Sequence, residues 1–320
     1  MKEPLVTVIC LCHNQASYAA EAIQSVLMQD YPSIELIACD DASTDGSAAI
    51  IGDLAEKHGF RNLLLTEQLG NCRAFNTALR LANGNYIIDL AADDLLLPGR
   101  LRVGVDALEA VGSDWGVHFC DAELIDAGGR SLGTHFPRDR EGRLAVEVPQ
   151  GDIYREVLRR YFISPPTVMT RREVFDNLGG YDDTLAYEDF DFWVRSSRRY
   201  RYAFSDRVLV QRRVLPSSLS RRQLQLRNPL TLSTAQVCEK ALTLNRNSGE
   251  NEALAERCRY ELKWACLTEN WQAVDLYRKL LHQLNSKGTA YRLSGLLRAL
   301  GLPLYRMFSL LILRAGSKRR

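Results

Sequence analysis

Two adjacent carboxylates, Asp93 and Asp94, follow an apolar run that begins at Tyr86 and has the composition of a buried strand. Two like charges at the mouth of a buried strand are unfavourable unless a cation lies beside them. A divalent cation such as Mg²⁺ prefers hard oxygen ligands and often brings a diphosphate with it. The pair therefore predicts a site for a divalent metal and a diphosphate. The alternative is a loop in which the two aspartates cap the next turn and helix.

A second acidic segment, residues 40–47 (DDASTDGS), follows an apolar run at residues 34–39. Both acidic segments thus stand at the carboxyl ends of expected strands. Ligands of open parallel sheets bind beyond these ends, where the strand order reverses, so one crevice could hold both segments. The alternative for residues 40–47 is a turn that caps the next helix.

The elements around these segments alternate between strand and helix patterns over the first hundred residues. We expect strands at 5–12, 34–39 and 63–66 and before Asp93, and helices between them, including 47–58 and 72–82. This alternation predicts an α/β fold, a mostly parallel, doubly wound sheet with helices on both faces. His13-Asn14-Gln15 stands where a glycine-rich dinucleotide fingerprint would be needed, which argues against a nicotinamide-binding protein.

The pattern changes after residue 117. We expect a strand at 118–125, a helix at 171–178, a helix at 194–200 and a strand at 201–210. Residues 127–151 are rich in Gly, Arg and Pro without periodicity, so we expect a mobile loop over the crevice. From about residue 219 the pattern is helical. We therefore expect two domains, residues 1–218 with the acidic segments and residues 219–320 with helices and a basic amphipathic tail.

The composition, with 46% hydrophobic and 25% charged residues, is that of a soluble globular protein. No stretch approaches the roughly 18 to 20 apolar residues that a membrane span needs. The N-terminus becomes polar too early for a secretory signal. The eight cysteines are scattered without a CxxC spacing. We expect buried thiols in a reducing, cytoplasmic compartment rather than disulfides or zinc ligands.

The net charge of +2 is unevenly distributed. Ten Lys and Arg and no acidic residue follow Asp275, whereas residues 1–275 hold 31 basic against 39 acidic residues. Residues 289–316 combine aliphatic side chains with regularly spaced arginines. This combination predicts attachment to an anionic membrane surface, such as the inner face of the cell membrane. The alternative is packing of the apolar stripe on the first domain. Basic residues among aliphatics rather than stacking aromatics do not indicate nucleic-acid binding.

Four segments in order give residues 4–220 a family likeness. They are VTVICLCHNQASYAAEAIQSVLMQDYPSIELIACDDASTDGS, LGNCRAFNTALRLANGNYI, the run into Asp93 and Asp94, and LGGYDDTLAYEDFDFW. Together they resemble the family-two inverting glycosyltransferases, whose fold is a nucleotide-diphospho-sugar-binding α/β domain. One such segment would be weak support, but four with family-like spacing are specific.

For the donor, the resemblance implies that Asp41 reads the uracil base and that His13 and Arg73 belong to the nucleotide-sugar site. A surface role for Arg73 is the alternative. Of Asp93 and Asp94, one contacts the ribose and the other holds Mn²⁺ or Mg²⁺, and the order stays open. A metal there would offset the charge of the departing diphosphate.

For the acceptor, the resemblance assigns Asp189 as the general base, with Tyr187, Glu188 and Trp193 lining the acceptor site. Partial desolvation among aromatic side chains raises the basicity of a carboxylate, which suits removal of a hydroxyl proton. Direct displacement with one base predicts inversion at the anomeric carbon. The alternative is a capped helix with solvated acids.

Three positions depart from the family pattern. Ala91 stands where the metal motif often has an extra aspartate, and Phe75 replaces the arginine usual before Asn76. Residues 212–215 lack the histidine that often precedes the Pro-Ser turn. If that histidine helps to hold metal or diphosphate, Arg213 or water takes its place.

The resulting hypothesis is transfer of a sugar from a nucleoside-diphosphate donor, UDP first, to a hydroxyl of a glycan or lipid-linked acceptor. The setting would be surface polysaccharide or lipopolysaccharide assembly of the bacterial type. The alternatives are a non-catalytic sugar-nucleotide-binding or membrane scaffold protein and a sugar nucleotidyltransferase. A Gly-rich, basic first turn would favour the nucleotidyltransferase, and the sequence has none.

Overall fold

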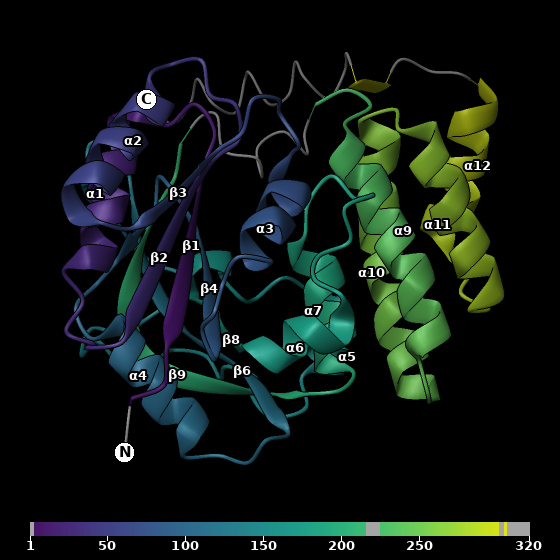
Figure 1. The fold of residues 1–320 in the computed structure, drawn as a ribbon. Coiled ribbons are helices and arrows are strands. Elements are labelled where there is room, and N and C mark those ends of the chain that lie inside the picture. The colour runs from purple at the N-terminus through teal and green to yellow at the C-terminus, as the bar shows by residue number, and fades with distance from the viewer. Residues whose placement is uncertain (1–2, 216–224, 301–303, 306–320) are drawn as a thin grey trace. The chain divides into compact units, whose positions relative to one another are not determined.

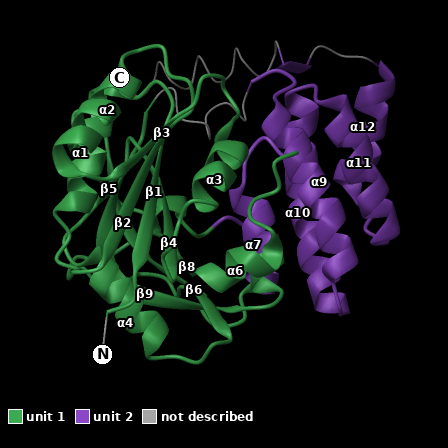
Figure 2. Cartoon of the chain, viewed as in Figure 1, with its two compact units in different colours: residues 1–153, 162–184, 195–215 green, residues 154–161, 185–194, 216–320 purple. Residues whose placement is uncertain are grey.

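The computed structural model describes residues 3–215, 225–300 and 304–305 (Figure 1). Its residues form two compact units (Figure 2). Unit 1 comprises residues 1–153, 162–184 and 195–215, and unit 2 comprises residues 154–161, 185–194 and 216–320. The boundary expected between residues 218 and 219 lies outside the described residues and stays a prediction.

Unit 1 is built on a nine-stranded sheet with the order β3-β2-β1-β4-β8-β6-β9-β5, and β7 pairs with β6 outside this path. The strands are β1 (Val6–Cys12), β2 (Ile34–Asp40), β3 (Arg61–Leu64), β4 (Tyr86–Ala91), β5 (Leu95–Leu96), β6 (Trp115–Ile125), β7 (Ser131–Thr134), β8 (Met169–Arg171) and β9 (Arg201–Arg213). The half made of β3, β2, β1 and β4 is parallel throughout.

Helices cover both faces of this parallel half, as the sequence predicts. Every residue of β1 is buried, because helices pack against both of its sides. The helices α1 (Ala16–Leu27), α2 (Ser47–His58) and α4 (Arg100–Glu109) contribute to one apolar cluster with β1 and β4. The helix α3 (Asn71–Leu79) contacts β1 and β2 and lies on the other side of the sheet in Figure 1.

The other half of the sheet is mixed. Strand β8 runs antiparallel to β4 and β6, whereas β6 and β9 are parallel. Strand β9 continues to Arg213, past the expected end at residue 210, because residues 211–213 pair with residues 123–125 of β6. This extension carries Arg213 to the Asp93–Asp94 turn.

Part of residues 127–151, where we expect a mobile loop over the crevice, has regular structure. Residues 131–134 form β7 on β6, and Arg138 bridges Leu144. The guanidinium of Arg138 also donates to the buried carboxylate of Asp121, at 2.8 and 3.0 Å. Backbone pairing and a buried ion pair thus fix much of a segment that has no periodicity in the sequence.

Unit 2 is helical. It contains α5 (Tyr154–Arg159), α9 (Pro229–Leu244), α10 (Ser248–Leu267), α11 (Trp271–Gln283), α12 (Thr289–Leu300) and residues 189–194 of α7 (Asp189–Ser197). An asparagine side chain caps the N-terminus of three of these helices, Asn228 at α9, Asn247 at α10 and Asn270 at α11. Helix α10 packs against α5, α9, α11 and α12.

The eight cysteines are all buried and free, as expected. In the part of the chain that the structure describes, every helix is too short or too polar to cross a bilayer.

Candidate functional site

The carboxyl ends of β1, β2 and β4 lie next to one another in unit 1. The amide of Asp41 donates to the carbonyl of Cys12, and the amide of Ala92 donates to the carbonyl of Leu11, both at 2.8 Å. The polar turns after the three strands therefore begin at one edge of the sheet. This edge is where ligands bind in open parallel sheets.

Asp41 and His13 are in direct contact at this edge. The Nδ1 atom of His13 lies 2.7 Å from the carbonyl oxygen of Asp41. The Asp41 carboxylate accepts hydrogen bonds from the amides of Leu69, at 2.7 Å, and Gly70, at 2.9 Å. Asp41 therefore fixes the turn before α3, and each of its oxygens keeps one lone pair for another donor.

The neighbouring acids of residues 40–47 act mainly within the turn. The Asp40 carboxylate accepts from the Ser43 amide at 2.9 Å. Asp45 accepts from the amides of Ala16, at 2.9 Å, and Ser47, at 3.0 Å, which begin α1 and α2. The predicted alternative of a capping turn therefore describes Asp45.

Asp93 and Asp94 form the second half of the edge. Burial raises the pKa of both carboxyl groups, and the charge of Asp93 raises the pKa of Asp94 further. Asp94 is 6% exposed, and its Oδ1 accepts from the amide of Arg213 at 2.7 Å. A buried and a partly buried carboxylate side by side, both with raised pKa values, favour a cation beside them.

The donor set fits a divalent metal whose remaining ligands come from substrate. In the described ranges, no three His, Cys, Asp or Glu side chains gather as a preformed cage. Mg²⁺-type sites typically use one or two carboxylates with phosphate oxygens and water. Asp93 and Asp94 match that pattern. Ala91 ends β4 and adds no further carboxylate.

Arg213 does not replace the absent histidine as a group facing the diphosphate. Its side chain is 3% exposed. Its guanidinium donates to protein oxygens, among them the Asp93 carbonyl at 3.0 Å. Of the two alternatives, Arg213 or water, the expectation is therefore wrong for Arg213, whose guanidinium donates to protein oxygens within unit 1. The alternative of water stays a prediction.

Arg73 and Phe75 lie on α3. The Nε of Arg73 lies 3.5 Å from a carboxylate oxygen of Asp183, and both side chains are more than half exposed. A surface ion pair of this kind contributes little stability. Phe75 is fully buried and stacks on Tyr181.

The residues predicted for the acceptor side gather in unit 2. The buried hydroxyl of Tyr187 lies 2.6 Å from the hydroxyl of Tyr161 and 2.7 Å from that of Thr234. Glu188 and Trp193 are buried, and Asp189 is the partly exposed first residue of α7. The acceptor role of Tyr187, Glu188 and Trp193 and the base role of Asp189 stay predictions.

The sequence analysis did not single out Glu21. Its carboxylate accepts a hydrogen bond from the Arg213 guanidinium at 2.8 Å. The only signal for it in the sequence is its position on the helix that follows β1.

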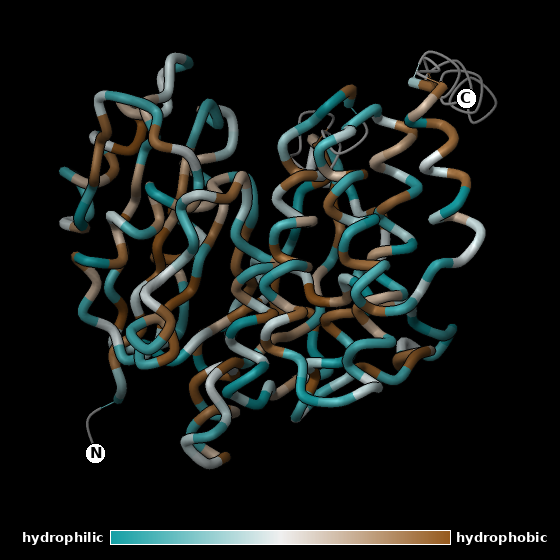
Figure 3. Tube along the Cα trace, turned by 90° about the vertical axis from the view of Figure 1, so that its right-hand side faces the viewer, coloured by the Kyte–Doolittle hydropathy of each residue, from teal (hydrophilic) through white to brown (hydrophobic). Residues whose placement is uncertain are grey.

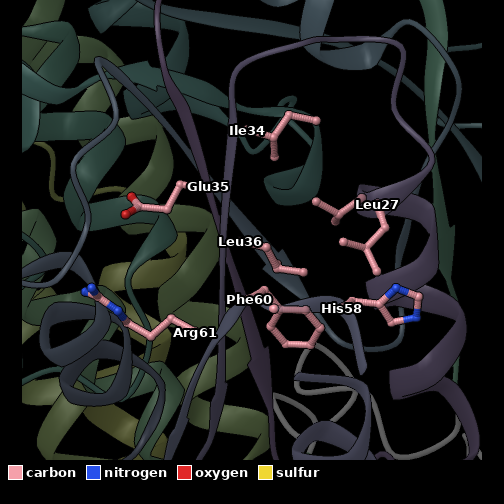
Figure 4. Close-up of a pocket in the computed structure, with 9 residues that line it drawn as sticks. Leu27, Ile34, Glu35, Leu36, His58, Phe60 and Arg61 are labelled. Carbon is pink, nitrogen blue, oxygen red and sulfur yellow. The ribbon is translucent and has the colours of Figure 1, made fainter. Parts of the chain in front are cut away.

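A surface hollow lies at the amino ends of β2 and β3, away from the carboxyl ends described above (Figure 4). Its lining includes Ile34 and Leu36 of β2, His58 at the end of α2 and Phe60 before β3. These are the amino ends of the two strands, so the hollow is not the edge that carries Asp41.

The fold and the acidic edge define a nucleotide-diphospho-sugar transferase type of domain, and comparisons give its family. The sequence profile of Glycosyl transferase family 2 matches residues 7–179. The chain belongs to glycosyltransferase family 2.

Several bacterial proteins are similar in sequence. An uncharacterized glycosyltransferase of Rickettsia prowazekii is 27% identical over 213 residues, which cover 66% of this chain and 64% of that protein. The chain thus matches less than two thirds of the length of this relative. EpsE of Bacillus subtilis, named as a putative glycosyltransferase, is 32% identical over a segment that covers 60% of this chain and 66% of EpsE. The succinoglycan biosynthesis protein ExoO of Rhizobium meliloti is 31% identical over a segment that covers 41% of this chain and 37% of ExoO.

Solved structures share the fold. Residues 1–349 of S. aureus TarS, in complex with UDP-GlcNAc, superpose with a TM-score of 0.66 at 19% identity, over 88% of this chain and 80% of that one. The mannosyltransferase PcManGT of Pyrobaculum calidifontis, in complex with GDP-Man and Mn²⁺, superposes with a TM-score of 0.57 at 21% identity. The match covers 97% of this chain and 84% of that one. At these identities the likeness establishes the fold alone.

Proposed function

We propose that the chain transfers a sugar from a nucleoside-diphosphate donor to an acceptor hydroxyl with inversion at the anomeric carbon. The observation that carries the proposal is the acidic edge of unit 1. Asp41 follows β2, and Asp93 and Asp94 follow β4, the two strands that flank β1. Burial raises the pKa of the carboxyl groups of Asp93 and Asp94. A site of this composition suits a nucleotide whose diphosphate arrives with a divalent cation.

UDP is the nucleotide we propose. Each Asp41 oxygen already accepts one backbone amide and can accept one more donor, such as the N3–H of uracil. The UDP-GlcNAc complex of TarS supports a uridine nucleotide, whereas the GDP-Man complex of PcManGT makes guanosine the competing choice.

Asp93 and Asp94 are the residues that would hold Mn²⁺ or Mg²⁺. When bound, such an ion supplies positive charge for the developing negative charge of the leaving diphosphate. The Mn²⁺ complex of PcManGT supports this assignment. The hydrogen bond from the Arg213 amide holds the Asp94 carboxylate in place, and the Arg213 Nε donates to the backbone carbonyl of Asp93.

Asp189 is the proposed general base. The proton of the acceptor hydroxyl passes to its carboxylate while the acceptor oxygen bonds to the anomeric carbon. The bond from that carbon to the diphosphate oxygen breaks on the opposite side, so the configuration inverts. The helix that begins at Asp189 is anchored within unit 2, because Asp191 pairs with Lys240 at 2.7 Å and Phe190 lies under the guanidinium of Arg257. A rigid element positions a base well.

The acceptor class we propose is a glycan or lipid-linked glycan in surface polysaccharide assembly. The similarity to ExoO, a succinoglycan biosynthesis protein, supports this class. A cytoplasmic location at the inner membrane face would suit a lipid-linked acceptor.

Helix α12 supports attachment to such a membrane face. Its residues alternate between hydrophobic and hydrophilic along the trace (Figure 3). Leu293, Leu296 and Leu300 share one side of the helix and are 51%, 56% and 58% exposed. The sequence after α12 is basic and lacks acidic residues. Exposed leucines next to basic residues suit an anionic bilayer surface.

A screen of nucleotide sugars tests the proposal. The protein is incubated with UDP-, GDP- and dTDP-sugars, with Mn²⁺ or with EDTA. We measure its stabilisation against heat, and the release of the nucleoside diphosphate when glycans are added as acceptors. We expect stabilisation by UDP-sugars that is larger with Mn²⁺ than with EDTA, and a product of inverted anomeric configuration by NMR. Pyrophosphate release from UTP and a sugar 1-phosphate would instead identify a nucleotidyltransferase. Donor binding without transfer to any acceptor would favour a scaffold protein.

A further inference from the structure

Arg213 joins four separate segments of unit 1. It is the last residue of β9, and its amide donates to Asp94 Oδ1 at 2.7 Å. Its Nε donates to the Asp93 carbonyl at 3.0 Å. The β4–β5 turn that carries the acidic pair is thus bonded to both the backbone and the side chain of one residue.

The rest of the guanidinium reaches two other segments. Its Nη1 donates to the carbonyls of Asp126, at 3.2 Å, and Ala127, at 3.3 Å, in the turn between β6 and β7. Its Nη2 donates to the carboxylate of Glu21 on α1 at 2.8 Å. The guanidinium carbon lies 4.5 Å from the ring centroid of Tyr18, also on α1.

This geometry depends on the shape of the guanidinium group. A planar fork with five N–H donors can serve acceptors on several sides at once, which the ammonium of a lysine cannot reproduce. The side chain is nearly inaccessible to solvent. Its positive charge is therefore held behind Asp93 and Asp94 and not presented to a ligand.

We propose that Arg213 is a positioning residue of the donor site, one that fixes the turn of Asp93 and Asp94 and thereby sets its affinity for the divalent metal. The inference rests on the proposed function, because it assumes that this turn binds the metal. Residues that orient metal ligands from behind typically change metal affinity about 10- to 100-fold when they are replaced.

Direct metal binding tests the inference without a sugar-transfer assay. Mn²⁺ is titrated into the full chain in the presence of saturating UDP, and free Mn²⁺ is measured by electron paramagnetic resonance. We expect Arg213→Lys to weaken Mn²⁺ binding by about 10- to 100-fold and Glu21→Gln, which removes one of the bonds, to weaken it less. UDP binding in EDTA should stay within about twofold of the wild type, whereas general loss of structure would lower it.

Two control variants separate position from charge. Arg201→Lys makes the same exchange at an exposed arginine paired with Asp114, and we expect no change. Arg212→Met removes a neighbouring charge that also acts on Asp93 and Asp94. We expect a smaller effect on Mn²⁺ from Arg212→Met than from Arg213→Lys.

Three results would overturn the inference. They are Mn²⁺ affinity unchanged in Arg213→Lys, equal losses in Arg213→Lys and Arg212→Met, or no Mn²⁺ binding by the wild type with UDP. Should Arg213→Lys fail to fold, Glu21→Gln decides in its place, and an unchanged affinity there counts against the inference. Normal Mn²⁺ and UDP binding without sugar transfer would contradict the proposed function but leave the role of Arg213 intact.

Discussion

Phe75 stacks on Tyr181, with ring centroids 4.2 Å apart and planes inclined by 28°. Phe175 packs against both rings, at 5.3 Å from Phe75 and 5.6 Å from Tyr181. The adjacent Asn76 bonds to both the amide and the carbonyl of Tyr181. The position at which the family usually has arginine is therefore part of an aromatic core in this chain.

Substitution of Phe75 should lower the free energy of unfolding, by an amount that depends on the side chain that is buried in its place. Phe75→Leu leaves part of the volume empty, and we expect a loss of about 1 to 3 kcal/mol in the free energy of unfolding. Phe75→Arg would bury an unpaired charge, and we expect a loss of about 4 kcal/mol or more. Urea unfolding measures both. An arginine variant as stable as the leucine variant would show that position 75 can open to solvent.

His118 should make stability depend on pH. It is fully buried, its Nε2 lies 2.9 Å from the Ser205 hydroxyl, and burial and the charge of Arg100 hold its pKa well below 6.5. The unfolded chain takes up this proton below about pH 6.5 and the folded chain does not, so stability falls as the pH falls through this range.

The size of the pH effect follows from one proton, at most about 1.4 kcal/mol per pH unit. Between pH 7.5 and 5.5 we expect wild type to lose about 1 kcal/mol more than His118→Gln. The exposed His58→Gln serves as the matched control for the loss of one histidine. Identical pH profiles of wild type and His118→Gln would mean that His118 accepts its proton in the folded state.

The leucines of α12 should contribute to binding of anionic vesicles. We expect the wild type to sediment with vesicles of phosphatidylcholine and phosphatidylglycerol but weakly with pure phosphatidylcholine. The triple change of Leu293, Leu296 and Leu300 to Ser should weaken binding by about tenfold or more, because three apolar side chains no longer enter the interface. Leu132→Ser alters a leucine on β7 that is 57% exposed and is the control. Equal binding by the triple variant and wild type would contradict the membrane role of α12.

Local patterns in the sequence predict the parallel half of the fold well. Strand β1 is buried at every residue and β2 from Leu36 onward, and α2 occupies the expected residues 47–58. The last residues of β9, Gln211 to Arg213, carry no apolar signal. Only their pairing with the end of β6 makes them a strand.

The contacts that shape the candidate site are distant in sequence, and this is why residue patterns do not predict them. Asp41 bonds to amides 28 and 29 residues away. Arg138 bonds to Asp121, 17 residues before it, and Arg213 to Glu21, 192 residues before it. The residue types at the acidic edge were predictable, whereas the partners that hold them were not.

The replacement Asp189→Asn tests the central claim most directly. Single-turnover transfer and donor binding are measured for the wild type, for Asp189→Asn and for Asp176→Asn, a matched change at an exposed aspartate paired with Arg172. We expect Asp189→Asn to bind the UDP-sugar and Mn²⁺ as the wild type does and to lose transfer by about 10²-fold or more, since the base is removed. Asp176→Asn should transfer at the wild-type rate. Transfer by Asp189→Asn at the wild-type rate would contradict the account.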